Sequence, residues 1–285
     1  MTFDYVAPTS VAEAVQLLER HGPDAHVMAG GSALMLLYKQ GLVRPGVVVA
    51  LHQVEGLRGI RRLDDGGLWV GAMTTHRQVE TSALVAAYCP ALARTFASIA
   101  TVRIRNQATI GGNLAHADPA QDPPPMLMAL DAVVEITGPA GERTSTLDTF
   151  FRDIFETSLE PGELITGIRF PAQAARTVAS YTKFLPRTED DYATVSVAVR
   201  LVRDAGGRAV AVAVCLGAAG PTPIRARRAE QALAGAELTM ATITDAAALV
   251  GDDVDPLDDF RGSIAYKRRT AVIHTRRALL ALAGS

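Results

Sequence analysis

The sequence predicts an α+β fold in two parts, a mixed α/β N-terminal part and a smaller C-terminal part with an antiparallel sheet and helices. Helical and strand patterns alternate as far as Pro171, and three consecutive strand-like runs then precede three helical segments. The chain has 285 residues, and a single core stops growing at about 250–300 residues. We therefore expect two domains, with a boundary near residues 172–178.

The first predicted helix begins after Ser10. Ser10-Val11-Ala12-Glu13 fits a capping box, and the apolar residues that follow recur at helical spacing. His21-Gly22-Pro23 is typical of a helix end, because glycine suits the residue after the last turn and proline cannot continue it.

The other elements of the N-terminal part alternate along the chain. Predicted strands cover residues 26–29, 47–51, 68–72, 132–137 and 164–170. Predicted helices cover residues 33–39, 75–88, 90–100 and 123–130. We expect Asp122 to cap the last of these helices, since proline at the first helical position favours a start there. Glu160-Pro161-Gly162-Glu163 predicts a turn between the last two strands.

The C-terminal part is predicted to be a meander followed by helices. Its strands are expected over 180–185, 194–203 and 208–216, with Asp204-Ala205-Gly206-Gly207 as the hairpin between the last two. Helices are expected over 225–234, 239–250 and 263–283. We therefore expect a three-stranded antiparallel sheet backed by helices.

Charge and hydropathy exclude several classes of partner. Net charge is −2, from 28 basic and 30 acidic residues, so no basic field favours nucleic acid or an anionic membrane. The longest apolar stretch, residues 209–219, is far shorter than the roughly 20 residues that span a bilayer. The N-terminus carries Asp4 where a signal peptide needs a basic flank. We expect no transmembrane segment and a cytoplasmic location.

Two cysteines, Cys89 and Cys215, are too few for a disulfide scaffold, a four-cysteine zinc site or a self-ligated iron–sulfur cluster. We expect both to be small buried hydrophobes. His52, His76 and His274 are scattered and predict no metal site. Neither G-x-S-x-G nor H-E-x-x-H occurs, so no catalytic residue is predicted.

Two glycine pairs are candidates for binding an anion. Gly30-Gly31 follows a predicted strand, and Gly111-Gly112 precedes a second helical segment. Glycine permits a positive φ and lets peptide N–H groups approach a ligand, and such a loop at a helix N-terminus suits phosphate. With hydroxyl groups from Ser32 and Thr109, the two loops would suit a dinucleotide pyrophosphate. Each pair alone is also what a tight turn requires, and the absence of G-x-G-x-x-G argues against a Rossmann domain.

The stretch from Arg103 to Leu130 is the most specific part of the chain. It combines the second glycine pair with Asn113, His116, Asp118 and Asp122. A carboxylate accepts hydrogen bonds from the vicinal hydroxyls of a ribose or ribityl chain, so acids beside a phosphate loop indicate a nucleotide. His116 has no Cys or carboxylate partner at ligand spacing, and we assign it no catalytic role.

Several blocks together resemble a known family. They are Ala29 to Ser32 with Lys39, Val70 to Thr75, Thr109 to Asn113 with Asp118-Pro119 and Asp122, Tyr181 to Lys183, Asp191 to Thr194, and Tyr266 to Arg269. In this order they resemble the FAD-binding medium subunits of the molybdenum hydroxylases, the xanthine dehydrogenase family. Within that family the chain most resembles the aerobic carbon monoxide dehydrogenase type.

The resemblance implies an FAD-binding domain of the PCMH/vanillyl-alcohol oxidase type over residues 1–174. It would consist of two α/β subdomains, about 1–55 and 56–174, with FAD between them. A smaller C-terminal α+β flavoprotein domain would cover residues 175–285.

The resemblance also assigns site residues. The pyrophosphate would be held by two loops, whose residues are Ala29, Gly30, Gly31, Ser32, Ala33 and Leu34, and Thr109, Ile110, Gly111, Gly112 and Asn113. Thr74 and Thr75 would lie near the nucleotide, Asp118, in the block that begins at Thr109, would also contact the cofactor, and Asp122 would bind a sugar or ribityl hydroxyl. Ile99 would face the flavin ring, Lys183 would lie near its carbonyl edge, and Tyr192 would belong to a segment that covers the ring.

Plainer explanations exist for some of these residues. Lys183 and Arg187 at a strand end are typical of solvated cations, and Tyr192 is typical of a packing residue. The first loop reads Gly31-Ser32-Ala33 where relatives often have a larger polar residue and a second hydroxyl, so we expect one pyrophosphate donor to be missing. This difference bears on affinity rather than on the fold.

The implied function is electron transfer by an oxidoreductase subunit. A large molybdopterin-containing subunit would oxidise carbon monoxide, a purine, an aldehyde or an N-heterocycle. A small subunit with [2Fe-2S] clusters would pass the electrons to FAD, and a quinone or other acceptor would take them. A dimer of such heterotrimers is expected. Two alternatives stay open: a self-sufficient flavoenzyme of the same FAD fold, and a binding module that has lost FAD.

Overall fold

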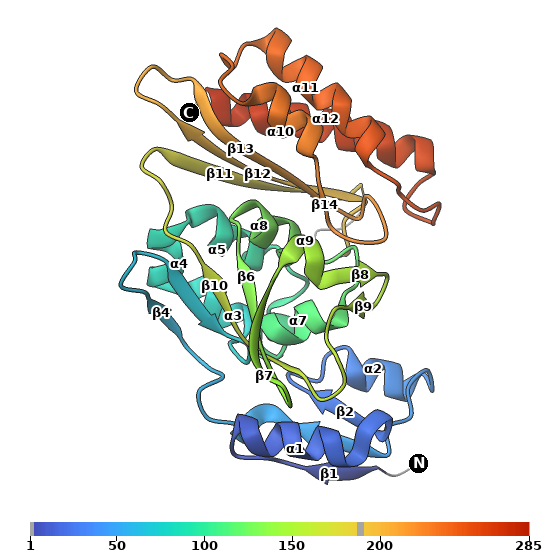
Figure 1. Ribbon diagram of the computed structural model, residues 1–285. Coiled ribbons are helices and arrows are strands. Elements are labelled where there is room, and N and C mark those ends of the chain that lie inside the picture. Colours follow the sequence, from blue (N-terminus) through green and yellow to red (C-terminus); the bar gives the residue numbers. More distant parts are fainter. Residues whose placement is uncertain (1–2, 187–190, 285) are drawn as a thin grey trace.

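The computed structural model describes residues 3–186 and 191–284. Three main sheets, each with its own helices, follow one another from the N-terminal end of the molecule to the C-terminal helices (Figure 1). We call these the N-terminal unit, the central unit and the C-terminal unit, and the elements of each are given below. Each unit has a hydrophobic core of buried side chains.

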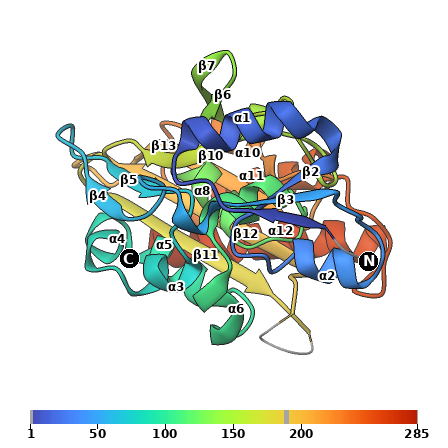
Figure 2. The ribbon, with the colours of Figure 1, turned by 90° about the horizontal axis from the view of Figure 1, so that it is seen from below.

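The N-terminal unit is a parallel sheet with strand order β1-β3-β2. Its strands are β1 Asp4–Val6, β2 Ala25–Met28 and β3 Val47–Ala50, and its helices are α1 Val11–His21 and α2 Leu34–Lys39. Seen from below, α1 and α2 lie on either side of these strands (Figure 2). The central strand β3 is buried along its whole length, as expected for a parallel strand covered on both faces.

Helix α1 begins as the sequence predicts. The Ser10 hydroxyl accepts a hydrogen bond from the Glu13 N–H, and Glu13 Oε2 accepts one from the Thr9 N–H rather than from Ser10. Ala14, Val15 and Leu18 form the buried stripe. Two single-turn 3-10 helices, Gly22–Asp24 and Leu51–Gln53, follow α1 and β3.

The central unit is an antiparallel sheet with strand order β4-β5-β10-β6-β7. Its strands are β4 Ile60–Arg62, β5 Leu68–Gly71, β6 Val133–Gly138, β7 Gly141–Thr146 and β10 Leu164–Phe170, and β8 Phe151–Asp153 pairs with β9 Glu156–Thr157 beside it. Its helices are α3 His76–Thr81, α4 Ala83–Tyr88, α5 Pro90–Ala97, α6 Val102–Gln107, α7 Ile110–His116, α8 Pro123–Ala129 and α9 Leu147–Phe150.

The C-terminal unit is an antiparallel sheet with strand order β11-β12-β13-β14. Its strands are β11 Thr177–Phe184, β12 Val195–Arg203, β13 Ala209–Gly217 and β14 Ile224–Arg225, and its helices are α10 Arg227–Leu233, α11 Met240–Asp253 and α12 Ile264–Ala283. The helices cover the outer face of the sheet, and α5 and α8 of the central unit lie under its inner face (Figure 1).

The two faces of β12 show why this sheet joins two cores. Val195, Val197 and Val199 face the helices of the C-terminal unit, whereas Ala198 between them belongs to the central core. Side chains alternate between faces with a period of two in a strand. Small residues on the inner face let α8 approach closely; a methyl group at Gly217 would lie 2.8 Å from Pro125 Cγ.

The predicted α+β class is confirmed, as are the predicted meander and its hairpin. Four expectations were wrong in detail. The C-terminal sheet has a fourth strand, the two-residue β14, which is too short for a periodic pattern. The helix predicted over 75–88 is two helices, because Ser82 caps α4. The helix predicted over 90–100 ends at Ala97. The predicted Glu160–Glu163 turn is present, and β7, α9, β8 and β9, which were not predicted, lie between β6 and this turn. Gly111 and Gly112 lie inside α7 rather than before it.

Candidate functional site

Three segments distant in sequence meet between the N-terminal and central units: residues 29–34, residues 72–76 and residues 107–113. A methyl group at Gly30 would lie 2.0 Å from the carbonyl oxygen of Gln107, and one at Gly112 would lie 3.2 Å from the Ala29 methyl group. Thr75 and Thr109 form an isolated antiparallel bridge. The two predicted glycine loops are therefore in direct contact.

The glycines serve this contact in different ways. Gly31 has φ +73°, a conformation that favours glycine. Gly30 and Gly111 instead leave room for neighbouring backbone, since a methyl group at Gly111 would lie 2.6 Å from the Ala72 methyl group. The expectation that every glycine lets a ligand approach was too simple, because most of the space that they leave is filled by protein.

The first loop presents a run of unused main-chain donors. Among the described residues, no protein group accepts a hydrogen bond from the N–H groups of residues 30–34. The Ser32 hydroxyl is buried and has no hydrogen-bond partner in the described chain. Consecutive free N–H groups beside a buried hydroxyl form a set of donors that suits phosphate oxygens.

The second loop differs from its prediction, because its N–H groups are already used. Ile110 N–H donates to the Thr74 carbonyl and Gly111 N–H to the Ala72 carbonyl. Gly112 N–H donates to the Thr109 hydroxyl at 3.1 Å, and Asn113 N–H donates to the Thr109 carbonyl. What this segment offers a ligand is side chains: the Thr109 hydroxyl hydrogen and the buried Asn113 Oδ1, which has no partner among the described residues.

Thr74 and Thr75 support this arrangement from α3 and the turn before it. The Thr74 hydroxyl accepts from the Gly59 N–H and donates to the Gly59 carbonyl, both at 3.0 Å. The Thr75 hydroxyl caps α3 by accepting from the Gln78 N–H. The Thr74 side chain is thus occupied within the protein, and its carbonyl holds the start of α7.

Asp122 does not cap α8, which corrects the sequence-based expectation: its side chain makes no capping hydrogen bond. Its carboxylate instead accepts from the Tyr181 hydroxyl at 2.5 Å and from Lys183 Nζ at 3.0 Å. Burial raises the pKa of Asp122, and the Lys183 ammonium opposes that rise. Burial and the neighbouring Asp122 raise the pKa of Tyr181, so this phenol stays protonated and donates.

Lys183 is linked to the segment of Ile99 by a hydrogen bond to the preceding residue, Ser98. Lys183 Nζ also donates to the Ser98 carbonyl at 3.0 Å. Ile99 is 8% exposed and packs against the central core. Asp122 and Lys183 thus form an ion pair with each other, and this pair lies beside the segment that contains Ile99.

Asp118 and Tyr192 lie on the same side of the molecule. Asp118 Oδ1 accepts from the Ala120 N–H. Burial raises the pKa of Tyr192, and the charges of Asp118 and Asp122 add to that rise. Arg261 holds the Tyr192 segment: its Nη2 donates to Asp191 at 3.0 Å, and its guanidinium lies 5.7 Å from the Tyr192 ring centre. Arg187 lies outside the described residues.

Sequence reasoning missed three residues that organise this region: Tyr181 as a site residue, Arg105 and Arg261. Tyr181 stood within a matching block, and its place two residues before Lys183 on one strand puts both side chains on the same face of the sheet. Nothing in the local sequence around Arg105 or Arg261 indicates that their partners lie in other elements.

These residues fit an FAD diphosphate. The free N–H run and the unpartnered Ser32 hydroxyl lie where the two loops touch and can donate to phosphate oxygens. The unpartnered Asn113 amide oxygen is an acceptor, so it suits a hydroxyl or N–H group of the cofactor and not the diphosphate. Main-chain N–H groups hold phosphate without a cation, because their dipoles all point at the anion.

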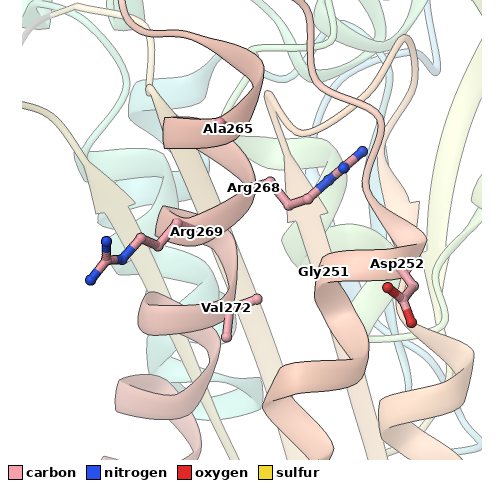
Figure 3. Close-up of a pocket in the computed structure, with 6 residues that line it drawn as sticks. All are labelled: Gly251, Asp252, Ala265, Arg268, Arg269 and Val272. Atoms are coloured by element: carbon pink, nitrogen blue, oxygen red, sulfur yellow. The ribbon is translucent and has the colours of Figure 1, made fainter.

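Other parts of the described chain add no second site of this kind. No cluster of three or more His, Cys, Asp and Glu arranged for a metal occurs among the described residues. Within the same ranges, no helix combines the length and apolar character needed to cross a membrane. A surface pocket between α11 and α12 is lined by Gly251, Asp252, Ala265, Arg268, Arg269 and Val272; Arg268 reaches toward α11, and Arg269 points away from it (Figure 3). Cys89 and Cys215 are buried free thiols, as predicted.

Two families of known sequences match the chain. Residues 1–173 match the "FAD binding domain in molybdopterin dehydrogenase", and residues 180–282 match the "CO dehydrogenase flavoprotein C-terminal domain".

Similar proteins cover nearly the whole length. The carbon monoxide dehydrogenase medium chain of Afipia carboxidovorans is 37% identical over 98% of this chain and 96% of its own length. The xanthine dehydrogenase FAD-binding subunit of Escherichia coli O157:H7 is 30% identical, with coverages of 96% and 94%. Among solved structures, a chain of the Cu,Mo-CO dehydrogenase superposes with a TM-score of 0.95 at 36% identity, covering 99% of this chain and 98% of that one. A chain of quinoline 2-oxidoreductase from Pseudomonas putida 86 gives 0.92 at 34% identity, with coverages of 100% and 98%.

Proposed function

Because the chain belongs to the family of FAD-binding medium subunits of the carbon monoxide and xanthine dehydrogenases, we propose that it relays electrons from [2Fe-2S] clusters to an external acceptor. The predicted membership, the fold type and FAD as cofactor are thereby confirmed, and the chain is an oxidoreductase subunit. The similarity to two carbon monoxide dehydrogenase medium chains supports a complex that oxidises carbon monoxide.

The observation that carries the proposal is the meeting of the two glycine segments. In our assignment, the N–H groups of residues 30–34 and the Ser32 hydroxyl bind the diphosphate, and Thr109 and Asn113 contribute side-chain contacts. Thr75, Ile110, Gly111 and Gly112 shape the site through the backbone contacts given above. Asp118 and Tyr192 remain predicted cofactor contacts, and Asp122 is assigned to a buried ion pair that supports the site.

Bound FAD supplies electron storage, since a flavin accepts electrons one at a time and releases them singly or in pairs. The residues of this chain bind and orient it. Buried Lys183 and Asp122 form a neutral pair beside Ile99, so they place no unbalanced charge near that side chain. No residue of this chain is assigned a proton transfer or a covalent step.

The partners in this proposal are a large molybdopterin-containing subunit and a small [2Fe-2S] subunit, in a cytoplasmic dimer of heterotrimers. The relatives are named as chains or subunits of dehydrogenases, which supports an assembly of several chains. We also propose domain limits of 1–174, with subdomains of about 1–55 and 56–174, and 175–285. Three separate sheets and the gap between β10 and β11 support these limits.

Co-expression with its two companion chains tests the proposal. We expect the purified complex to be yellow, to bleach anaerobically with carbon monoxide, and to regain its colour when a quinone is added. The matched control is this chain alone loaded with FAD, which should not bleach with carbon monoxide. Bleaching by a purine, an aldehyde or an N-heterocycle instead would overturn the substrate. Turnover of a small substrate by the chain alone would contradict the electron-transfer role.

A further inference from the structure

The turn formed by Ser98, Ile99 and Ala100 is held on both sides by cations that are largely shielded from solvent. Lys183 Nζ donates to the Ser98 carbonyl at 3.0 Å. Arg105 Nη1 donates to the Ile99 carbonyl at 2.7 Å and to the Ala100 carbonyl at 2.8 Å. Three successive carbonyl groups thus accept hydrogen bonds from charged donors, which are stronger than those from neutral donors.

Each cation is neutralised by its own acid. Arg105 Nε donates to Glu80 at 2.9 Å, with side chains 12% and 13% exposed. Lys183 lies 3.0 Å from Asp122, with side chains 7% and 5% exposed. Removing charges from water is costly, and the cost is offset only where pairing and further hydrogen bonds are good. The two pairs come from α6 with α3, and from β11 with the start of α8, so four elements converge on one turn.

The turn itself is strained. Ala100 has φ +36°, a region that residues with a β-carbon seldom occupy. Strained backbone persists only where its surroundings fix it, and such sites gather where function needs a preset geometry. Here the surroundings are the two cations, because they bind the carbonyl groups of the strained residue and of the two residues before it.

We propose that Arg105 and Lys183 are positioning residues that clamp the turn Ser98–Ala100 and thereby fix Ile99 for the flavin ring. The placement of Ile99 at the ring rests on the proposed function; the clamp itself rests on the contacts above. Neither cation touches the cofactor in this proposal. Both act through the turn, which explains why both side chains bind carbonyl groups and acidic side chains of the protein itself.

Hydrogen exchange in the cofactor-free chain tests the clamp without any flavin. The Ser98 and Ile99 N–H groups donate to the last turn of α5 and report on loosening. In Arg105→Gln, we expect these amides to exchange about tenfold faster, since the loss of charged hydrogen bonds lowers local stability. Arg77→Gln is the matched control, because Arg77 also pairs with Glu80, at 2.6 Å, but is half-exposed and makes no described contact with the turn.

The flavin is the second readout. Arg105→Gln should bind FAD about tenfold more weakly and shift the visible flavin spectrum, whereas Arg77→Gln should match the wild type. Arg105→Lys keeps the charge but lacks the fork of donors, so it should fall between the two. If Arg105→Gln does not fold, the same measurements on Arg105→Lys decide.

The clamp would be overturned if the Arg105 variants had the same amide exchange rates and flavin spectrum as the wild type. It would also be overturned if Arg77→Gln changed both as much as Arg105→Gln does. If the wild-type chain takes up no FAD, the proposed function fails, and the exchange data still decide whether the clamp exists.

Discussion

Replacing Lys183 by methionine is expected to destabilise the folded chain by about 3–5 kcal/mol, the usual cost of leaving one member of a buried ion pair unpaired. The Asp122 side chain is only 5% exposed, and Lys183 Nζ is its cationic partner at 3.0 Å. Methionine fills a similar volume, so cavity formation adds little. The Ser98 carbonyl loses a donor in the same step.

The double substitution Asp122→Asn with Lys183→Met separates charge from packing. It removes both charges and keeps an amide that accepts from Tyr181, which donates to Asp122 Oδ1 in the wild type. Since replacing a buried pair by neutral groups is often close to neutral, we expect it to recover at least about 2 kcal/mol relative to Lys183→Met.

The pH dependence of this cost has a defined sign. Burial raises the pKa of Asp122, and removing Lys183 takes away the charge that opposes the rise. Above its ordinary pKa, an acid raised in the folded state binds more protons when folded than when unfolded, so stability falls as pH rises. The deficit of Lys183→Met should therefore shrink as the pH is lowered from 8 to 5.

Urea unfolding measures these differences. The fluorescence of Trp69, the single tryptophan, reports on the central unit, and circular dichroism reports on the whole chain. Lys39→Met, at an exposed position on α2, is the control for a lost lysine. The reasoning is refuted if Lys183→Met lies within 1 kcal/mol of the wild type, or if the double variant is as unstable as the single one.

Two further substitutions test the packing of the site and its titration. Gly30→Ala would place a methyl group 2.0 Å from the Gln107 carbonyl oxygen, so it should lower the free energy of unfolding by about 1–3 kcal/mol and weaken FAD binding. Gly206→Ala is the control, because the new methyl group would have no neighbour nearer than 3.4 Å. Equal urea unfolding curves for the two variants would refute this prediction. Burial, with the Arg105 charge, lowers the pKa of His76 to about 3 in the folded chain. As the pH falls from 7 to 5, this histidine is therefore protonated in the unfolded chain but not in the folded one, and the free energy of unfolding of the wild type should fall by about 2 kcal/mol. His76→Gln should lack that loss in urea titrations at the two pH values; an unchanged loss would contradict the assignment.

The sequence predicted the elements that have a clear period and the blocks that define the site. The capping box at Ser10, the alternation in β12 and the long helices at the C-terminus are local patterns, and local patterns survive folding. β1, β4 and β14 span only two or three residues each, and α6 follows no apolar period, so none of them was predicted.

The role of Asp122 shows why the rest was out of reach. Asp122-Pro123 correctly predicts the start of α8, but the carboxylate is used by Tyr181 and Lys183, 59 and 61 residues away. The second glycine pair was located correctly and its use misjudged, because Gly111 N–H donates to the Ala72 carbonyl of another segment and Gly112 N–H donates to the Thr109 hydroxyl. Contacts of this kind depend on tertiary structure, which no local pattern encodes.

Titration of the cofactor-free wild type and of Ala33→Pro with FAD shows whether the free N–H run over residues 30–34 binds the diphosphate. Ala33 has φ −81°, close to the value that proline imposes, and its N–H has no acceptor among the described residues. The substitution therefore deletes one donor of the run over residues 30–34 and no internal hydrogen bond. Ala33→Gly, which keeps the N–H, is the control. We expect one FAD per wild-type chain and binding at least about tenfold weaker for Ala33→Pro. Equal affinity of the two, or no uptake by the wild type, would contradict this expectation.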